Sequence, residues 1–295
     1  MTGTTLAVRR TSSPPRGVYR HRRRAVLYWV ATHAIAIALA LMFLAPLIFM
    51  FLTAVMSSDE TLTGSLWPHG WHWGNFGRAL TTDHGVMLHW LAHTVMYAVL
   101  ATFFMLLSST PVAYALARFR FRGRKFAFLM VITTMMLPPQ VTIVPMYILW
   151  ARFQLTGSLW PLILPNLFGD AFSIFLLRQF LVTIPKEYAD AARVDGCGEF
   201  RTMVRVILPM ARPAIAAVAL FQFFYAWNDY FGPLIYTKPD SWTLAVGLST
   251  FRAAHHVEWN LTMAATLLTV LPVIIVFFLA QRVFIQGVTL TGVKG

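Results

Sequence analysis

The chain has 295 residues, of which 58% are hydrophobic and only 12% are charged, and its formal net charge is +13. A water-soluble domain normally carries about a quarter charged residues, so this chain has too few polar side chains to cover a soluble globule. The positive charge could suggest a nucleic-acid partner, but the basic residues crowd into short segments beside long apolar runs, as in membrane proteins. Composition therefore favours an all-α integral membrane protein that binds no nucleic acid.

The amino-terminal region is strongly basic and is followed by an apolar run from Ala25 to Met56. This run is much longer than the apolar core of a signal peptide, and no small-residue cleavage site closes it. We therefore expect residues 1–24 to be a basic cytoplasmic tail and the apolar run to be a retained membrane helix. The single cysteine, Cys197, excludes an internal disulfide.

Six apolar segments are long enough to cross a bilayer, which takes about 20 residues. They cover approximately residues 27–56, 88–117, 126–151, 159–181, 206–236 and 264–285. Most contain prolines, which bend a membrane helix where neighbouring spans can satisfy the freed carbonyls. The sequence therefore predicts a six-helix transmembrane domain over residues 25–285, followed by a cytoplasmic tail at 286–295.

Basic residues are distributed unevenly among the connecting segments. Eighteen Lys and Arg lie in the amino-terminal tail, the 118–125 and 182–205 segments and the region after 281, whereas four lie in the alternate loops. Positively charged loops remain in the cytoplasm. We therefore expect a multi-pass protein of the cell (inner) membrane with both termini cytoplasmic, and membrane lipid as its surroundings.

Polar side chains inside the predicted spans are candidates for a translocation path, because such groups are costly in a bilayer. These residues are Asn166, Asp170, Gln222, Trp227, Asn228 and Asp229. Hydrogen-bonding groups beside aromatic rings suit the passage of polyols, whose hydroxyls need partners when they lose water. Bonding between helices is the alternative interpretation of the same residues.

The segment 183–205 differs from the other basic loops because its charges nearly balance. Pro185 suits a helix start, and Asp190 is spaced to pair with Lys186 or with Arg193 on one helix surface. Gly196 then predicts a break, because glycine accepts backbone angles that side chains forbid. A second short helix from Glu199 would continue towards the fifth span, which predicts a helix–turn–helix projecting into the cytosol.

This segment resembles the EAA motif of ABC importer permeases, E-A-A-x3-G-x9-I-x-L-P. The matching residues are Asp190-Ala191-Ala192, Gly196 and Val206-Ile207-Leu208-Pro209, with Asp and Val replacing the Glu and first Ile of the motif. Further stretches, including MLPPQVTIVPMYIL at 136–149 and WNDYFGPLI at 227–235, are similar to the maltose-type sugar permeases. The resemblance covers nearly the whole chain after Leu27.

The resemblance implies that the 183–205 segment forms coupling helices that dock onto an ATP-hydrolysing subunit. The implied docking residues are Glu187, Asp190, Ala191, Ala192, Asp195 and Gly196, and a tail with Gln286, Gly287 and Lys294 is implied to reach the interface of an ATPase dimer. The implied partners are a second permease subunit, the ATPase pair and an external solute-binding protein that delivers a sugar.

No G-x-x-x-x-G-K-[ST] loop is present, so ATP and Mg²⁺ would be bound by partner subunits, and we expect this chain to hold no cofactor and to catalyse no reaction. Paired histidines, such as His89 and His93, lack the further ligands that a zinc site needs. The alternatives are a glycerophosphodiester or polyol as substrate, a proton-coupled carrier using Asp170 and Asp229 as relays, and a membrane-embedded enzyme.

Overall fold

The computed structural model describes residues 17–254 and 258–289, and these residues form only helices and loops. The first half of the chain contains α1 (Gly17–Ala54), α2 (Ser58–Leu62), α3 (Gly74–Arg118), α4 (Arg124–Met135), α5 (Pro139–Arg152), α6 (Trp160–Ile163), η1 (Leu164–Phe168) and α7 (Ala171–Thr183). The second half contains α8 (Glu187–Val194), α9 (Glu199–Thr202), η2 (Met203–Ile207), α10 (Leu208–Met210), α11 (Arg212–Asn228), α12 (Phe231–Tyr236), η3 (Pro239–Ser241), α13 (Leu244–Ala254) and α14 (Trp259–Thr289).

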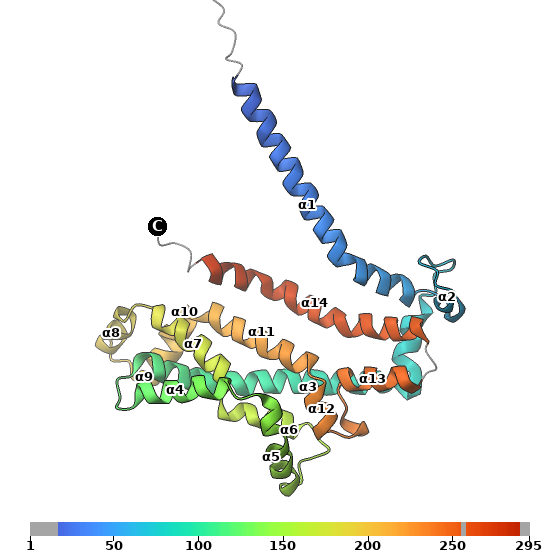
Figure 1. Cartoon of the computed structure of the whole chain (residues 1–295). Helices are drawn as coiled ribbons and strands as arrows, with labels where there is room; N and C mark the ends of the chain where they lie inside the picture. The colour runs from blue at the N-terminus through green and yellow to red at the C-terminus, as the bar shows by residue number, and fades with distance from the viewer. Residues whose placement is uncertain (1–16, 255–257, 290–295) are drawn as a thin grey trace, which may run out of the picture. The chain divides into compact units, whose positions relative to one another are not determined.

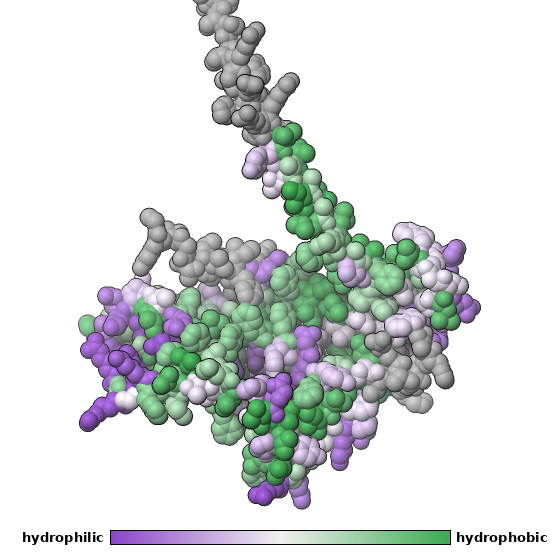
Figure 2. Space-filling view, viewed as in Figure 1, coloured by the Kyte–Doolittle hydropathy of each residue, from purple (hydrophilic) through white to green (hydrophobic). Residues whose placement is uncertain are grey.

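The chain divides into two units, residues 1–52 and 53–295. The first unit consists, in its described part, of α1. No residue in the most apolar stretch of this helix is buried, and hydrophobic side chains cover it on the face shown in Figure 2. A helix that is apolar all round and unburied is suited to hydrocarbon rather than water.

The second unit is built around α3, which contacts α7, α11, α14 and α13 (Figure 1). Small side chains on α3, including Ala98, Ala101 and Ala113, are buried in these contacts. Small residues let membrane helices approach closely, where packing rather than the hydrophobic effect drives association. Figure 2 shows the hydrophilic residues gathered at the end of this unit that carries α8 and α9.

Four helices are long and apolar enough to cross a membrane, namely Leu27–Ala54, Gly85–Arg118, Trp160–Thr183 and Trp259–Gln281. Two further pairs qualify as broken spans: α4 with α5, bent by 94°, and the helix over Glu199–Met210 with α11, bent by 81°. Counting each bent pair as one span gives six, so the predicted all-α membrane fold is confirmed.

The kinks predicted in 126–151 and 206–236 are breaks that divide each segment into separate helices. The first breaks at Met136–Pro138 and the second at Ala211 and again at Asp229. The cause lies in the prolines: each removes a backbone donor and disfavours helical angles in the residue before it. Pro138 lies in the first break and Pro139 begins α5, and Pro213 lies in the first turn of α11, just after the break at Ala211.

The predicted tails also differ from the structure where they are described. Helix α1 already begins at Gly17 and therefore includes part of the basic tail predicted over 1–24. Helix α14 extends to Thr289, so Gln286 and Gly287 lie in its last turns rather than in a separate tail. Arg9, Arg10 and Arg16 lie outside the described residues.

Aromatic side chains form an exposed row between α2 and α3. The rings of Trp67 and Trp71 meet edge to face at 6.4 Å between centroids, and those of Trp71 and Trp73 stack at 5.9 Å. Their placement outside the long apolar helices is compatible with the interfacial belt expected of membrane proteins.

Gly247 on α13 provides a test of this packing, because a Cβ added there would overlap the indole ring of Trp90 on α3. We expect Gly247→Ala to lower the stability of the purified chain in detergent by about 1–3 kcal/mol, the usual cost of overpacking a core. Thermal unfolding measures the change. Gly77→Ala is the matched control, because Gly77 is exposed on α3 with open space at its Cβ. Equal melting temperatures for the two variants would contradict the packing of α13 on α3.

Candidate functional site

Two regions of the second unit contain the predicted site residues: the helix–turn–helix of α8 to α10 and a cavity among the spans. In the first, the predicted break is confirmed, because α8 ends at Val194 and Gly196 has a φ of +78°. The amides of Gly196 and Cys197 donate to the carbonyls of Arg193 and Ala192, which closes the end of α8. Only glycine adopts such a left-handed angle readily, so Gly196 sets the direction in which the next helix leaves.

Arg193 holds the two short helices together. Its guanidinium donates to Asp190 Oδ1 at 2.7 Å and to Glu199 Oε1 at 2.8 Å. The hydrogen bond that Arg193 donates to Glu199, together with the charge of that carboxylate, raises the pKa of Arg193. The predicted pairing of Asp190 with Arg193 is therefore confirmed, whereas no ion pair joins Asp190 to Lys186 among the described residues.

Two further contacts attach this motif to α3. The Tyr114 hydroxyl donates to Glu199 Oε2 at 3.3 Å, and Arg118 Nη2 donates to the carbonyl of Ile184 at 2.8 Å. Tyr114 and Arg118 lie one turn apart on α3, so one helix face contacts both the residues just before α8 and the start of α9. Sequence reasoning did not identify either residue, since nothing local marks a contact across 66 or 85 positions.

The implied docking residues are not all on the surface. Glu187, Asp190, Ala191, Asp195 and Gly196 are exposed, but Ala192 is only 7% exposed and packs inside the chain, as Ala189 does. Ala192 therefore lets α8 lie close to its own subunit rather than to a partner. Three exposed apolar side chains that the sequence interpretation passed over lie on the motif, namely Tyr188, Val194 and Phe200, of which Val194 is 88% exposed.

The second region is a cavity of about 1070 Å³ lined by α3, α5, α6, η1, α7, α11 and α12. Of the predicted path residues, five line it: Asn166, Asp170, Gln222, Asn228 and Asp229. Trp227 does not, because it is 4% exposed and its indole nitrogen donates to the carbonyl of Thr269 on α14. Tyr97, Gln140 and Tyr225 also line the cavity and were not predicted.

A hydrogen bond between Asn166 and Gln222 joins two walls of this cavity, η1 and α11. Gln222 Nε2 donates to Asn166 Oδ1 at 3.0 Å, while Asn166 Nδ2 donates to the carbonyl of Leu162 at 2.9 Å. Each amide therefore has a fixed orientation. Asn166 and Asp170 do not share a helix face, because Gly169 separates η1 from α7 and interrupts the helix.

The two carboxylates of the cavity lie at helix breaks. Asp170 caps α7, where its Oδ2 accepts from the amide and the hydroxyl of Ser173 at 2.7 and 2.6 Å. Asp229 follows α11 and accepts from the Tyr97 hydroxyl and from the amide of Gly232, both at 3.0 Å. These bonds give both acids a structural role in closing helix ends.

The described residues add no metal site to these two regions. No group of three His, Cys, Asp or Glu side chains that could hold a metal ion occurs in residues 17–254 and 258–289 as far as they are described. Lys294 lies outside the described residues, and of Gln286 and Gly287 only their place in α14 is described.

Comparison with known proteins matches residues 109–290 to the family described as binding-protein-dependent transport system inner membrane component. The arabinooligosaccharides transport system permease protein AraQ of Halalkalibacterium halodurans is 32% identical over 92% of this chain and 98% of its own length. The diacetylchitobiose uptake system permease protein NgcG of Streptomyces coelicolor is 30% identical over 85% of this chain and 84% of its own. The sn-glycerol-3-phosphate transport system permease protein UgpE of Pectobacterium atrosepticum is 34% identical over 88% and 95%, respectively.

Solved structures show the same fold. A chain from the crystal structure of a bacterial ABC transporter involved in the import of the acidic polysaccharide alginate superposes with a TM-score of 0.77 at 24% identity. The match covers 88% of this chain and 97% of that one.

Arg118 allows the attachment of the helix–turn–helix to be tested. We expect Arg118→Met to leave the Ile184 carbonyl without its donor and to make the 183–205 segment at least severalfold more sensitive to limited proteolysis. The purified chain in detergent, followed by mass spectrometry of the fragments, provides the measurement. Arg120→Met is the control, because Arg120 is exposed and makes no such bond. Equal cleavage rates in the two variants would show that Arg118 does not hold the segment.

Proposed function

Because the chain belongs to the family of inner membrane components of binding-protein-dependent transport systems, we propose that it carries a neutral sugar through its cavity as one permease subunit of an ATP-driven importer. The lining of the cavity is the observation that favours a neutral sugar as the substrate. Amide, hydroxyl and aromatic side chains face it together with the capping carboxylates of Asp170 and Asp229, and no Lys, Arg or His is among the described residues that line it. Sugars need hydrogen-bond partners and apolar surfaces rather than counter-charges.

The relatives support a sugar in a second way. AraQ is named for arabinooligosaccharides and NgcG for diacetylchitobiose, both of which are carbohydrates. UgpE is named for sn-glycerol-3-phosphate, which carries a phosphate. A phosphate taken out of water favours Arg or Lys as partners, and the cavity offers none of these. A glycerophosphodiester therefore fits this cavity less well than a neutral sugar or polyol.

The proton-coupled carrier is wrong for a chain of this family, whose transport is driven through a partner. The structure also gives no support to a relay, because Asp170 and Asp229 are each held by their own capping bonds. The ATP and Mg²⁺ would be bound by a pair of ATPase subunits, and an external solute-binding protein would deliver the sugar.

The surface we assign to ATPase docking is the exposed side of the helix–turn–helix. It combines the acids Glu187, Asp190 and Asp195 with the apolar Tyr188, Val194 and Phe200. Exposed apolar side chains with a charged rim are typical of a docking surface. The end of α14 with Gln286 and Gly287, followed by Lys294, would extend towards the same partner, and a second permease subunit would complete the translocation path.

Gly196→Pro should abolish ATP-driven uptake, because proline fixes φ near −65° where the structure has +78°. The turn would then aim the second helix elsewhere and displace the docking surface. The measurement is co-purification with the ATPase, together with sugar uptake by proteoliposomes supplied with binding protein and ATP. Asp190→Lys should act similarly, since it places a like charge beside Arg193.

Gly198→Ala is the matched control for the turn. Gly198 has an ordinary φ of −68° and open space at its Cβ. If Gly196→Pro and Asp190→Lys transport at the rate of this control, the docking role of the motif is wrong.

Gln222→Leu tests the cavity. Losing the bond to Asn166 leaves that amide without its partner, so we expect uptake to fall about tenfold, corresponding to roughly 1.4 kcal/mol. Assembly with the ATPase should remain unchanged, since Gln222 lies far along α11 from the docking surface. Gln179→Leu makes the same substitution on α7 at an exposed position outside the cavity lining. Normal uptake by Gln222→Leu would show that Gln222 is not part of the translocation path.

The proposed orientation can be tested by labelling cysteines in a Cys197→Ser background. Cysteines introduced at Gly64, Arg122 and His255 should be accessible from the outside, the inside and the outside, respectively. The reason is the distribution of Lys and Arg over alternate loops. His255 itself lies outside the described residues. Any other order of labelling in intact cells would contradict cytoplasmic termini.

A further inference from the structure

The short loop between α3 and α4 concentrates positive charge in a stretch of sequence that contains no acid. Arg118, Arg120, Arg122, Arg124 and Lys125 fall within eight positions, and no Asp or Glu occurs in the sequence from Arg118 to Gly169. Orientation of the chain requires only an excess of basic residues on one side, which the other cytoplasmic segments already supply. Such density therefore needs a further explanation.

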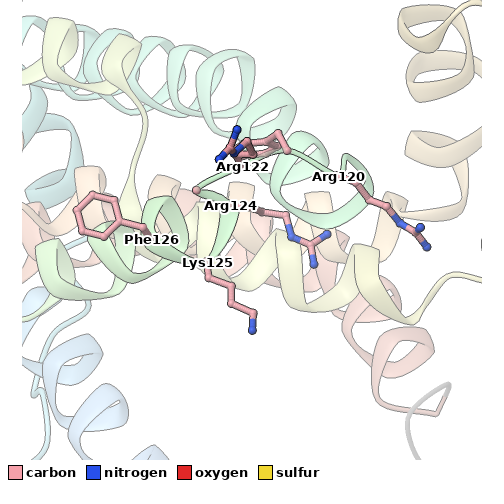
Figure 3. A pocket seen from close by; sticks show the side chains of 7 residues that line it. Arg120, Arg122, Arg124, Lys125 and Phe126 are labelled. Carbon is pink, nitrogen blue, oxygen red and sulfur yellow. The ribbon is translucent and has the colours of Figure 1, made fainter.

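Two of these cations have structural roles, and three do not. Arg118 donates to the Ile184 carbonyl, and Arg124 Nη1 donates to the carbonyl of Phe119 at 3.1 Å. Arg120, Arg122 and Lys125 are exposed, and no carboxylate lies within ion-pair distance of them in the described part of the chain. Figure 3 shows Arg120 and Lys125 extending away from the backbone.

Aromatic side chains alternate with these cations. The sequence runs Arg118-Phe119-Arg120-Phe121-Arg122, and Phe119 has extended backbone angles, so neighbouring side chains point to opposite sides. Phe121 and Phe126 are 46% and 66% exposed, and Leu129 continues the apolar surface along α4. The loop therefore presents cations beside exposed apolar groups.

Residues 120–126 line a shallow, open hollow of about 730 Å³ (Figure 3). It lies at the membrane boundary, since the span on α3 ends at Arg118 and the next broken span begins at Arg124. A ligand here would meet positive charge on one side and hydrocarbon on the other.

We infer that this loop, residues 118–126, binds the phosphate of an anionic phospholipid in the cytoplasmic leaflet. Guanidinium groups match phosphate oxygens in geometry and charge, and the exposed Phe side chains suit the boundary between headgroups and acyl chains. A soluble phosphate would leave the aromatic side chains unused. The inference rests on the proposed cytoplasmic orientation, but lipid binding by the purified chain can be measured independently of orientation and of transport.

The test compares lipid affinities of the full-length chain in neutral detergent by native mass spectrometry, with phosphatidylglycerol and phosphatidylcholine as probes. We expect wild type to bind phosphatidylglycerol at least tenfold more tightly. The combined variant Arg120→Gln, Arg122→Gln and Lys125→Gln should lose most of this preference. Each basic residue near an anionic lipid contributes about fivefold, so three correspond to roughly a hundredfold. Added salt should weaken the wild type more than the variant.

A matched control removes the same charge elsewhere. Lys186→Gln, Arg201→Gln and Arg205→Gln change three exposed cations of the 183–205 segment, and phosphatidylglycerol affinity should stay within about twofold of wild type. Arg118 and Arg124 are kept in both variants, so the structural bonds remain.

Several results would overturn the inference. A wild type without preference for phosphatidylglycerol, or a loop variant that keeps the preference, would show that the loop is no lipid site. Displacement of the lipid by millimolar inorganic phosphate would identify a site for a free anion instead. A loop variant that loses ATPase binding but keeps its lipid affinity would assign the loop to a protein partner.

Discussion

Backbone amides and carbonyls inside a bilayer have no water to bond with, so each break in a spanning helix of this chain needs a partner group close by. The break between η1 and α7 meets this requirement with side chains: Ser109 accepts from the amide of Asp170, whose carboxylate caps α7. The break after α11 is closed by Asp229, which accepts from Gly232. The first role of these polar residues is thus to bond the backbone groups that the helix breaks leave without partners.

The cavity follows from the same constraint. Broken helices leave space between their ends, and the groups that close those ends necessarily line it. Asn166 both closes a helix end and lines the cavity. Its amide nitrogen donates to the carbonyl of Leu162, while its amide oxygen accepts a hydrogen bond from Gln222 on α11. A hydrogen-bonded lining of this kind is already oriented before a substrate arrives, which lowers the cost of ordering side chains around a sugar.

The sequence predicted those features that depend on local composition. The length of the apolar segments predicted six spans. The positive φ at Gly196 could be expected because a glycine follows the helix predicted after Pro185. The breaks at Ala211 and Met136–Pro138 could not be distinguished from kinks, because proline is compatible with both in a membrane. The burial of Ala192 and Trp227 and the bond between Tyr97 and Asp229, 132 positions apart, depend on tertiary contacts that one sequence does not display.

Helix α3 joins the two candidate regions into one mechanical unit. Tyr114 at one end contacts Glu199 of the helix–turn–helix, and Tyr97 on the same helix contacts Asp229 at the cavity. The two tyrosines are 17 residues apart, which corresponds to about 25 Å along a helix. Exposed ion pairs such as Arg193–Asp190 contribute less than about 1 kcal/mol each, so stability alone is a weak reason for this network. The network also has a direction: Arg193 joins the short helices and Arg118 bonds the residue before α8, so under the proposed docking role a push on α8 would be transmitted to α3 and along it to the groups that line the cavity.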